Sequence, residues 1–286
     1  MSQNSDYSMF HSWLSLPRDE EFSKKVITYI IASNIVWFFM FFVVGLNHPL
    51  PKAIMDKTKE YDRLVLRHRL IQVYHGLVAF SMGLYWYIYK NDRTCSKRID
   101  DYELILLVNT SGHFVWDCIF MKYHGFLDTG NLIHHAMGIV SYYFTAYQQY
   151  NHNLLALNIL PAETTNVNMH LREIFKRIGW RYTWAYYWNE YQYCYMYILC
   201  RAIWIPGVFY WMYICDTVNP AVLIIYPLHA VMGCYYVSHL PKMIKMRNSE
   251  LKKIKKAGLK LEWFNPIPIE KIKEHQIDGK FEAYTM

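Results

Sequence analysis

Two adjacent histidines, His134 and His135, lie a few residues inside an apolar segment of the chain. An ionisable side chain is costly to keep in hydrocarbon, so such a residue is a candidate functional residue by default. A neutral imidazole could take a proton from an amine or a hydroxyl group, and the second histidine or Asp117 could orient it. The three residues are therefore candidates for general-base chemistry.

The elements that must position these side chains are helices long enough to cross a bilayer. Of the 286 residues, 53% are hydrophobic and 19% are charged, which is too apolar for an ordinary soluble domain. The mean hydropathy of -0.02 hides this because tyrosine and histidine score as polar. Long apolar stretches alternate with basic loops, and most approach the roughly 20 residues that span a membrane. The predicted spans are 26–46, 70–89, 102–121, 131–150, 154–175, 184–213 and 221–238.

This pattern predicts an all-α, polytopic membrane protein of about seven transmembrane helices, six of which enclose a lipid-sized cavity. Residues 1–25 form a polar N-terminal segment, 26–245 the transmembrane domain and 246–286 a charged C-terminal tail. The cavity is expected to accept a lipid because its walls are aliphatic and aromatic while one end is ionisable.

The charges of the loops predict the orientation. Lysine and arginine concentrate in loops that would share one side, including 52–69, 176–181 and 242–256. Because such residues are retained on the cytoplasmic or matrix side, we expect the C-terminus there and the N-terminus outside. The net charge of +7 fits contact with anionic lipids better than binding of nucleic acid. The polar first residues do not resemble a signal peptide, and the endoplasmic reticulum and the mitochondrial inner membrane both remain open.

Several ionisable side chains are predicted to share one depth in the membrane. Counted inward from the basic side at about 1.5 Å per residue, they fall roughly 6 to 9 Å below the surface. Scattered polar groups have no reason to share a level, so this polar layer is predicted to be a site or a former site. Its members come from four different spans and are His75, Asp117, His134, His135 and His170.

Three further residues extend the polar layer. His113 precedes Asp117 by one helical turn and lies deeper on the same face. Glu163 is deeper again, beside Pro161, where a kink would free backbone carbonyls. Arg201, well inside the sixth span, needs a carboxylate partner, which Asp117 or Glu163 could supply.

Other conspicuous residues are better explained by packing. A lone histidine in a span, such as His229, is more often a satisfied packing residue. The cysteines show no CxxC pair and mostly fall inside predicted spans, so we expect neither a disulfide framework nor a zinc site. They are Cys95, Cys118, Cys194, Cys200, Cys215 and Cys234.

The order of the polar residues resembles that of the TLC family, the membrane domain shared by TRAM proteins and ceramide synthases. A histidine early in one span (His75 in RLIQVYH) is followed by an aspartate in the next (Asp117 in GHFVWD) and by a double histidine (DTGNLIHH). Glu163, His170 and Arg201 come after them. The resemblance extends over roughly residues 60–245.

Ceramide synthases use the double histidine with a pair of downstream aspartates, so the resemblance implies acyl-CoA-dependent N-acyl transfer. This chain departs from that pattern, because the corresponding stretch LPAETTNVN holds one glutamate and no second acid. It therefore resembles more closely the TLC-domain proteins outside the ceramide synthases, which are linked to membrane lipid composition. We expect His134, His135 and Asp117 to be catalytic if the protein is an enzyme, and His75, His113, Glu163, His170 and Arg201 to line a lipid site.

The leading expectation is a protein that binds lipid or controls membrane lipid composition. One alternative is a non-catalytic subunit of a large membrane complex, for example in the mitochondrial inner membrane, with a resident lipid and other membrane subunits as partners. Another is a ceramide-synthase-type N-acyltransferase, with acyl-CoA as co-substrate and no other cofactor. A membrane di-iron hydroxylase would need several HxxHH or HxxxH clusters where this chain has one HH, so no metal is expected.

Overall fold

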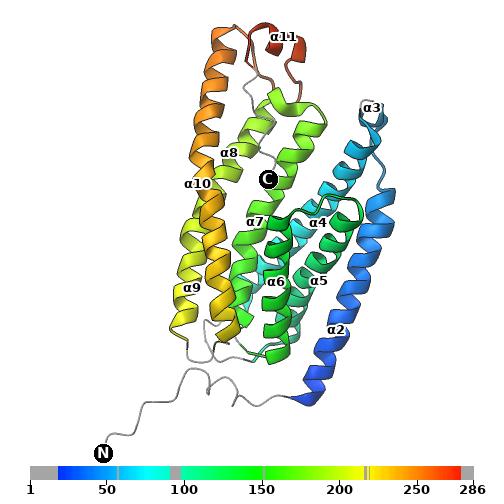
Figure 1. The fold of residues 1–286 in the computed structure, drawn as a ribbon, viewed down its shortest axis with the longest axis vertical. Coiled ribbons are helices and arrows are strands. Elements are labelled where there is room, and N and C mark those ends of the chain that lie inside the picture. Colours follow the sequence, from blue (N-terminus) through cyan, green and yellow to red (C-terminus); the bar gives the residue numbers. More distant parts are fainter. Residues whose placement is uncertain are drawn as a thin grey trace, which may run out of the picture.

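The computed structural model describes residues 19–56, 58–90, 98–150, 152–215, 218 and 220–277, and most of them are helical (Figure 1). Backbone pairing of the β type within these residues is limited to an isolated bridge between Arg98 and Tyr150. The elements in chain order are α2 (Glu20–Phe38), the π-helix η1 (Phe39–Gly45), α3 (Lys52–Met55), α4 (Glu60–Tyr89), α5 (Asp101–Tyr123), α6 (Thr129–Gln148), α7 (His152–Arg177), the 3-10 turn η2 (Trp180–Tyr182), α8 (Trp184–Ile198), the π-helix η3 (Leu199–Trp204), α9 (Ile205–Tyr213), α10 (Pro220–Lys256) and α11 (Ile269–Glu274).

The all-α prediction is confirmed. Within the described residues, three helices are long and apolar enough to cross a membrane, namely Glu20–Gly45, Asp101–Tyr123 and Val222–Lys256. Two helices extend well past the predicted spans, because α4 begins at Glu60 and α10 continues to Lys256. Charged residues end an apolar run without ending a helix, so hydropathy marks only the part suited to the bilayer.

Capping side chains fix where several of the helices begin. An acceptor oxygen at the N-cap satisfies one of the backbone N–H groups that the first helical turn leaves without a partner. Before α5, Asp100 accepts from the backbone of Glu103, whose carboxylate accepts in return from Asp100 N–H, which completes a capping box. The same role falls to Asp19 before α2, Asp128 before α6 and Thr183 before α8.

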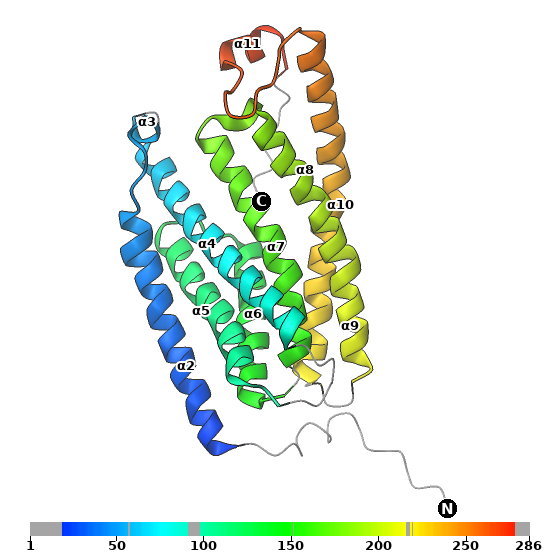
Figure 2. The same cartoon turned by 180° about the vertical axis from the view of Figure 1, so that it is seen from behind.

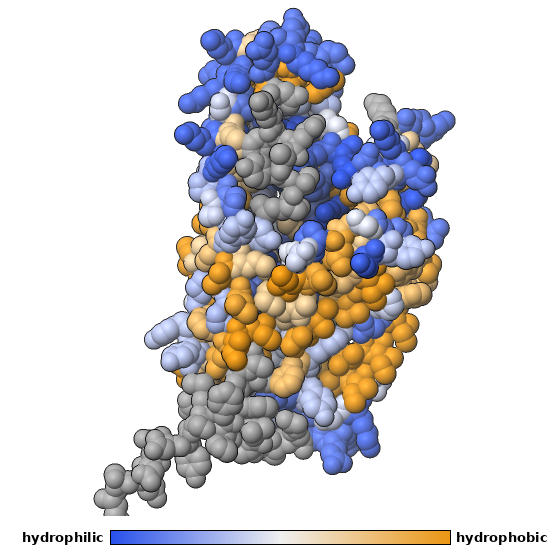
Figure 3. All heavy atoms as spheres, in the orientation of Figure 1, coloured by the Kyte–Doolittle hydropathy of each residue, from blue (hydrophilic) through white to orange (hydrophobic). Residues whose placement is uncertain are grey.

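The long helices run up and down in chain order and form a bundle with α2 at one edge and α10 near the other (Figures 1 and 2). Helix α2 packs mainly on α5, while α4 packs along α7. Because successive long helices run in opposite directions, three loops lie at the same end of the bundle as α11 (Figure 1). They are the loops before α4, between α5 and α6, and between α7 and α8. In Figure 3 hydrophobic residues gather in the middle of the visible face, and hydrophilic residues cover the end that carries α11.

The C-terminal part of the chain folds back on the bundle. After α10 the chain turns at Gly258, whose φ of +69° suits glycine, and runs beside the start of α8. There the N–H of Trp184 donates to the carbonyl of Glu262 at 2.8 Å. We call residues 257–277 the C-terminal lobe; its buried side chains pack on the α7–α8 junction and on α10, and they include Leu261, Ile267, Ile272 and Ile277.

The segment predicted as a tail, 246–286, therefore begins as the last turns of α10 and continues as the packed C-terminal lobe. Residues 278–286 lie outside the described part, as do residues 1–18 of the predicted N-terminal segment.

The expectation that the cysteines are packing residues is wrong for Cys215, which is disulfide-bonded. Cys215 lies beyond the end of α9, in a connection and not within a span. Cys95 is outside the described residues. The free cysteines within the described part are Cys118, Cys194, Cys200 and Cys234.

Candidate functional site

The buried carboxylate of Asp117 on α5 joins three helices. One of its oxygens accepts from Nε2 of His68 at 2.6 Å and also from the side-chain amide of Gln72, both on α4. The other oxygen lies 3.2 Å from Nε2 of His135 on α6. All four side chains are buried, so the acceptor oxygens are satisfied without water. We call these four residues the Asp117 cluster.

His68 was missed at the sequence level because it stands between two arginines in what is expected to be a basic loop. Helix α4 in fact begins at Glu60 and already carries His68 on its inner face. A signal was present: His68, Gln72 and His75 follow one another at helical spacing (i, i+4, i+7), which places them on one side of a helix.

Glu163 on α7 is the centre of a second polar group. Its carboxylate lies 3.4 Å from Nδ1 of His75 and accepts from the side-chain amide of Asn166 at 3.2 Å. The ring of His113 stacks on that of His75, with centroids 3.6 Å apart. Helices α4 and α7 approach closely here because Gly76 has no side chain; a Cβ at that position would lie 2.7 Å from Cγ2 of Val167.

The two adjacent histidines face different surroundings. Neighbouring side chains on a helix point about 100° apart. His135 therefore turns into the bundle toward Asp117, while His134 lines a cavity and lies edge to face against His229, with centroids 4.6 Å apart. Phe114 contacts both histidine rings and lies between the two environments.

The cavity has a volume of about 460 Å³ and opens among α6, α7, α8 and α10. A smaller space of about 30 Å³ shares with it His134, Asn166, Arg201 and His229 and reaches Glu163. The residues around the two spaces come from α4, α5, α6, α7, the α8–η3–α9 run and α10, so α2 stands outside. Methionines and tyrosines supply much of the wall: Met169, Met232, Met243, Met246, Tyr193, Tyr197, Tyr235 and Tyr236.

Arg201 lies where the two spaces meet. It belongs to the π-helix η3, in which the N–H of Ile205 reaches back five residues to the carbonyl of Cys200. The following Pro206 has no N–H to donate, which favours such a local change of hydrogen bonding. Gly233 on α10 leaves room for the alkyl part of Arg201, and the guanidinium lies 5.3 Å above the ring of Tyr197.

The predicted ion pair of Arg201 with Asp117 or Glu163 is not formed. Among the described residues no carboxylate lies within 4.0 Å of its guanidinium nitrogens, and Nε has no hydrogen-bond partner. The reason is that histidines already occupy both carboxylates: His68 and His135 contact Asp117, and His75 contacts Glu163.

His170, predicted in the same layer, also lies apart from the Asp117 cluster. Its Nδ1 accepts from the guanidinium of Arg69 at 3.2 Å. The single layer expected from the sequence thus divides into the Asp117 cluster, the Glu163 group with His75 and His113, the cavity face with His134 and Arg201, and the Arg69–His170 pair. Depth along an axis does not determine the direction in which a helix points its side chains.

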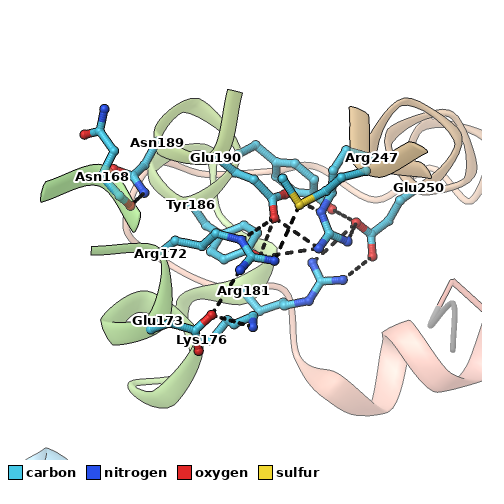
Figure 4. Close-up of polar contacts among 12 residues, drawn as sticks. Asn168, Arg172, Glu173, Lys176, Arg181, Tyr186, Asn189, Glu190, Arg247 and Glu250 are labelled. Atoms are coloured by element: carbon cyan, nitrogen blue, oxygen red, sulfur yellow. Dashed lines mark hydrogen bonds and ion pairs between the residues drawn. The ribbon is translucent and has the colours of Figure 1, made fainter. Parts of the chain in front are cut away.

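The wall of the cavity nearest the C-terminal lobe is held by a buried ion network (Figure 4). The carboxylate of Glu190 on α8 accepts from Arg172 on α7 at 2.7 Å and from Arg247 on α10. Arg247 also donates to Glu250 at 3.0 Å, and Arg181 binds the same carboxylate at 2.9 Å. The network ties together three helices that line the cavity.

No group of three or more histidine, cysteine, aspartate or glutamate residues in the described part is arranged to hold a metal ion. What the polar residues can do chemically follows from their contacts. The carboxylate of Asp117 is already engaged by three side chains inside the bundle, whereas His134, His229 and Arg201 line the cavity and are available to a ligand.

Comparison with known proteins completes the assignment. No curated protein matches the chain. The family model for the TLC domain (TRAM, LAG1, CLN8) matches residues 66–246. This region is more than half of the chain, runs from α4 into α10 and contains both histidine-bound carboxylates and the whole cavity wall. The chain therefore belongs to the TLC-domain family of integral membrane proteins.

Proposed function

We propose that this protein binds a membrane lipid in the cavity between α6, α7, α8 and α10 and takes part in controlling the lipid composition of its membrane. The observation that carries the proposal is the cavity itself. Its volume of about 460 Å³ falls in the range of ligand pockets, and its wall combines apolar side chains with a few convergent polar groups.

The proposed placement in the membrane puts the C-terminal lobe and the mouth of the cavity on the cytoplasmic or matrix side. Basic residues of α10 that follow its apolar part, such as Lys252, Lys253 and Lys256, support this orientation. The endoplasmic reticulum and the mitochondrial inner membrane both fit it.

Lipid binding is preferred to N-acyl transfer because of the surroundings of His134. Among the described residues no carboxylate lies within ion-pair distance of its ring, which packs against the rings of Phe114, His135 and His229. A general base usually needs a third group to orient it. Here the carboxylate of Asp117 is engaged by His135, which faces away from the cavity.

A second candidate is a non-catalytic subunit of a larger membrane complex, with the cavity occupied by a resident lipid. The observation that favours it is on the C-terminal lobe, where Trp263 and Phe264 are 56% and 65% exposed outside the apolar part of the bundle. Large aromatic residues exposed side by side are typical of contact surfaces.

Native mass spectrometry of the protein purified in mild detergent tests both candidates. We expect a lipid mass to remain on the wild-type protein and to be lost from Met232→Trp, which fills the cavity. The neighbouring substitution Val231→Trp is the matched control, because Val231 is 67% exposed on the outer face of α10. Equal lipid on both variants would indicate surface lipid and reject the proposal, and a large stoichiometric protein complex would support the second candidate.

N-acyl transfer is tested with the same preparation by adding a long-chain acyl-CoA and a long-chain amine. Formation of an amide that is lost in His134→Ala would establish the enzymatic alternative. We expect no product.

A further inference from the structure

Arg201 is a buried cation that faces the cavity. Its exposed fraction is 4%, and it lines both the large cavity and the smaller space beneath it. A guanidinium stays protonated in proteins and presents its donors in a rigid fork. A charge at this position, in a chain that crosses a membrane, therefore requires compensation.

Among the described residues no carboxylate forms an ion pair with Arg201, and Glu163 interacts with it only at longer range. Asp117 is bound by two histidines and Gln72, and Glu163 by His75 and Asn166. Burial of a charge without a counter-ion costs several kcal/mol, so a built-in cation with an unpartnered nitrogen points to a partner that comes from outside the chain.

We propose that the cavity contains an anion subsite at Arg201, which binds the anionic group, a phosphate or a carboxylate, of the lipid. The inference rests on the proposed function and names the chemical class of its ligand. A guanidinium recognises the oxygens of either group with two parallel hydrogen bonds. Tyr197 covers one face of the guanidinium, and Gly233 on α10 packs against the alkyl part of the side chain.

The groups around Arg201 suit an anion. His134, His229 and Asn166 line both spaces beside it and can each donate a hydrogen bond. Glu163 also borders the smaller space, but its charge is shared by His75 and Asn166. Toward the mouth of the cavity, the charged lining residues are the cations Arg69, Arg172 and Lys242 and the anions Asp128 and Glu173.

The walls favour an amphiphile over a free anion. Next to the polar groups lie Met169, Met232 and Leu240, which are flexible or aliphatic side chains suited to an alkyl chain. A free phosphate would leave this apolar surface in contact with water.

The test compares lipid binding by the full chain, purified in detergent and stripped of lipid, using native mass spectrometry. The probes are dioleoyl phosphatidylglycerol, dioleoylglycerol, oleate and inorganic phosphate. We expect the wild-type protein to retain phosphatidylglycerol and oleate at least about tenfold better than dioleoylglycerol, which has no anionic group. Arg201→Gln should lose this preference while still binding dioleoylglycerol, and Arg201→Lys, which keeps the charge, should retain part of it.

Lys245→Gln is the matched control, since it removes an equal charge from an exposed position of α10 that does not line the cavity. The control should keep the full preference. Thermal unfolding without lipid separates binding from folding: removal of an unpaired buried charge should leave Arg201→Gln at least as stable as the wild type. If Arg201→Gln cannot be purified, the wild-type preference and its retention by Arg201→Lys still decide the matter.

Each outcome has a distinct meaning. Equal retention of anionic and neutral lipid by the wild type, or an unchanged preference in Arg201→Gln, overturns the anion subsite and leaves lipid binding intact. Stabilisation by inorganic phosphate equal to that by the anionic lipids would show that the ligand is a free anion and not an amphiphile. A wild-type protein that retains no lipid of either kind overturns the proposed function as well.

Discussion

The double histidine is one motif in the sequence but two functional positions in the structure. His135 contacts the carboxylate of Asp117 within the bundle, and His134 lines the cavity beside His229. Substitution of His135 is therefore expected to lower the stability of the helix packing, whereas substitution of His134 is expected to change the affinity for lipid.

The Asp117 cluster gives the first prediction on stability. Asp117→Asn should lower the free energy of unfolding by about 2 kcal/mol, because one carboxylate oxygen becomes an amide nitrogen, which can neither accept the hydrogen bond from His68 nor pair with His135. Thermal unfolding in detergent measures the change.

His134→Ala is the control for Asp117→Asn. It removes a side chain that lines the cavity, so its unfolding temperature should stay close to that of the wild type. If His134→Ala destabilises the protein as much as Asp117→Asn does, the division of the histidine pair into two roles is refuted.

At the scale of the elements, Pro161 shows how one helix depends on another. Proline has no N–H, so the carbonyl of Leu157, one turn earlier in α7, lacks its usual helical donor. The indole N–H of Trp204, at the end of η3, donates to that carbonyl at 3.2 Å. The carbonyl freed by Pro161 in α7 thus forms a hydrogen bond with η3, the π-helix that also contains Arg201.

A double-mutant cycle on this contact is the second prediction. Trp204→Phe should cost about 2 kcal/mol in the wild type, since it leaves a buried carbonyl without a donor. In a Pro161→Ala background the helix regains its own hydrogen bond to Leu157, so the same substitution should cost about 1 kcal/mol less. Chemical or thermal unfolding of the four proteins gives the coupling, and additive effects would contradict the assigned hydrogen bond.

These elements also show which features of the fold can be predicted from the sequence. Apolar runs locate the helices, and proline at 161 predicts a freed carbonyl, because both effects act along one segment of chain. The donor Trp204 and the partner His68 are not predictable in this way, since they depend on which faces of two helices meet. Arg201 was predicted to need a carboxylate for the right physical reason, but the two candidate acids are satisfied by histidines from α4 and α6.

For the whole molecule, the ion network around Glu190 connects the bundle to the C-terminal lobe. Arg172, Glu190 and Arg247 bring α7, α8 and α10 together at the end of the cavity, and Tyr187 extends the network to Glu250 with a hydrogen bond of 2.7 Å. Tyr186 and Tyr187 in turn belong to the apolar cluster that includes the lobe. We therefore expect a substitution that breaks the ion network to loosen both the C-terminal lobe and the mouth of the cavity.

Glu190→Gln tests whether the C-terminal lobe depends on the ion network. It leaves Arg172 and Arg247 buried without their shared counter-charge, and the free energy of unfolding should fall by about 3 kcal/mol. Asp101→Asn is the matched control, since the side chains of Asp101 and its partner Lys25 are 56% and 37% exposed and such pairs contribute about 0 to 1 kcal/mol.

Because α8 and the lobe share backbone hydrogen bonds at Trp184, hydrogen exchange should accelerate in residues 257–277 as well as in α8 of Glu190→Gln. Faster exchange confined to α8 would show that the lobe is held independently of the network, and the cavity mouth would then not depend on it.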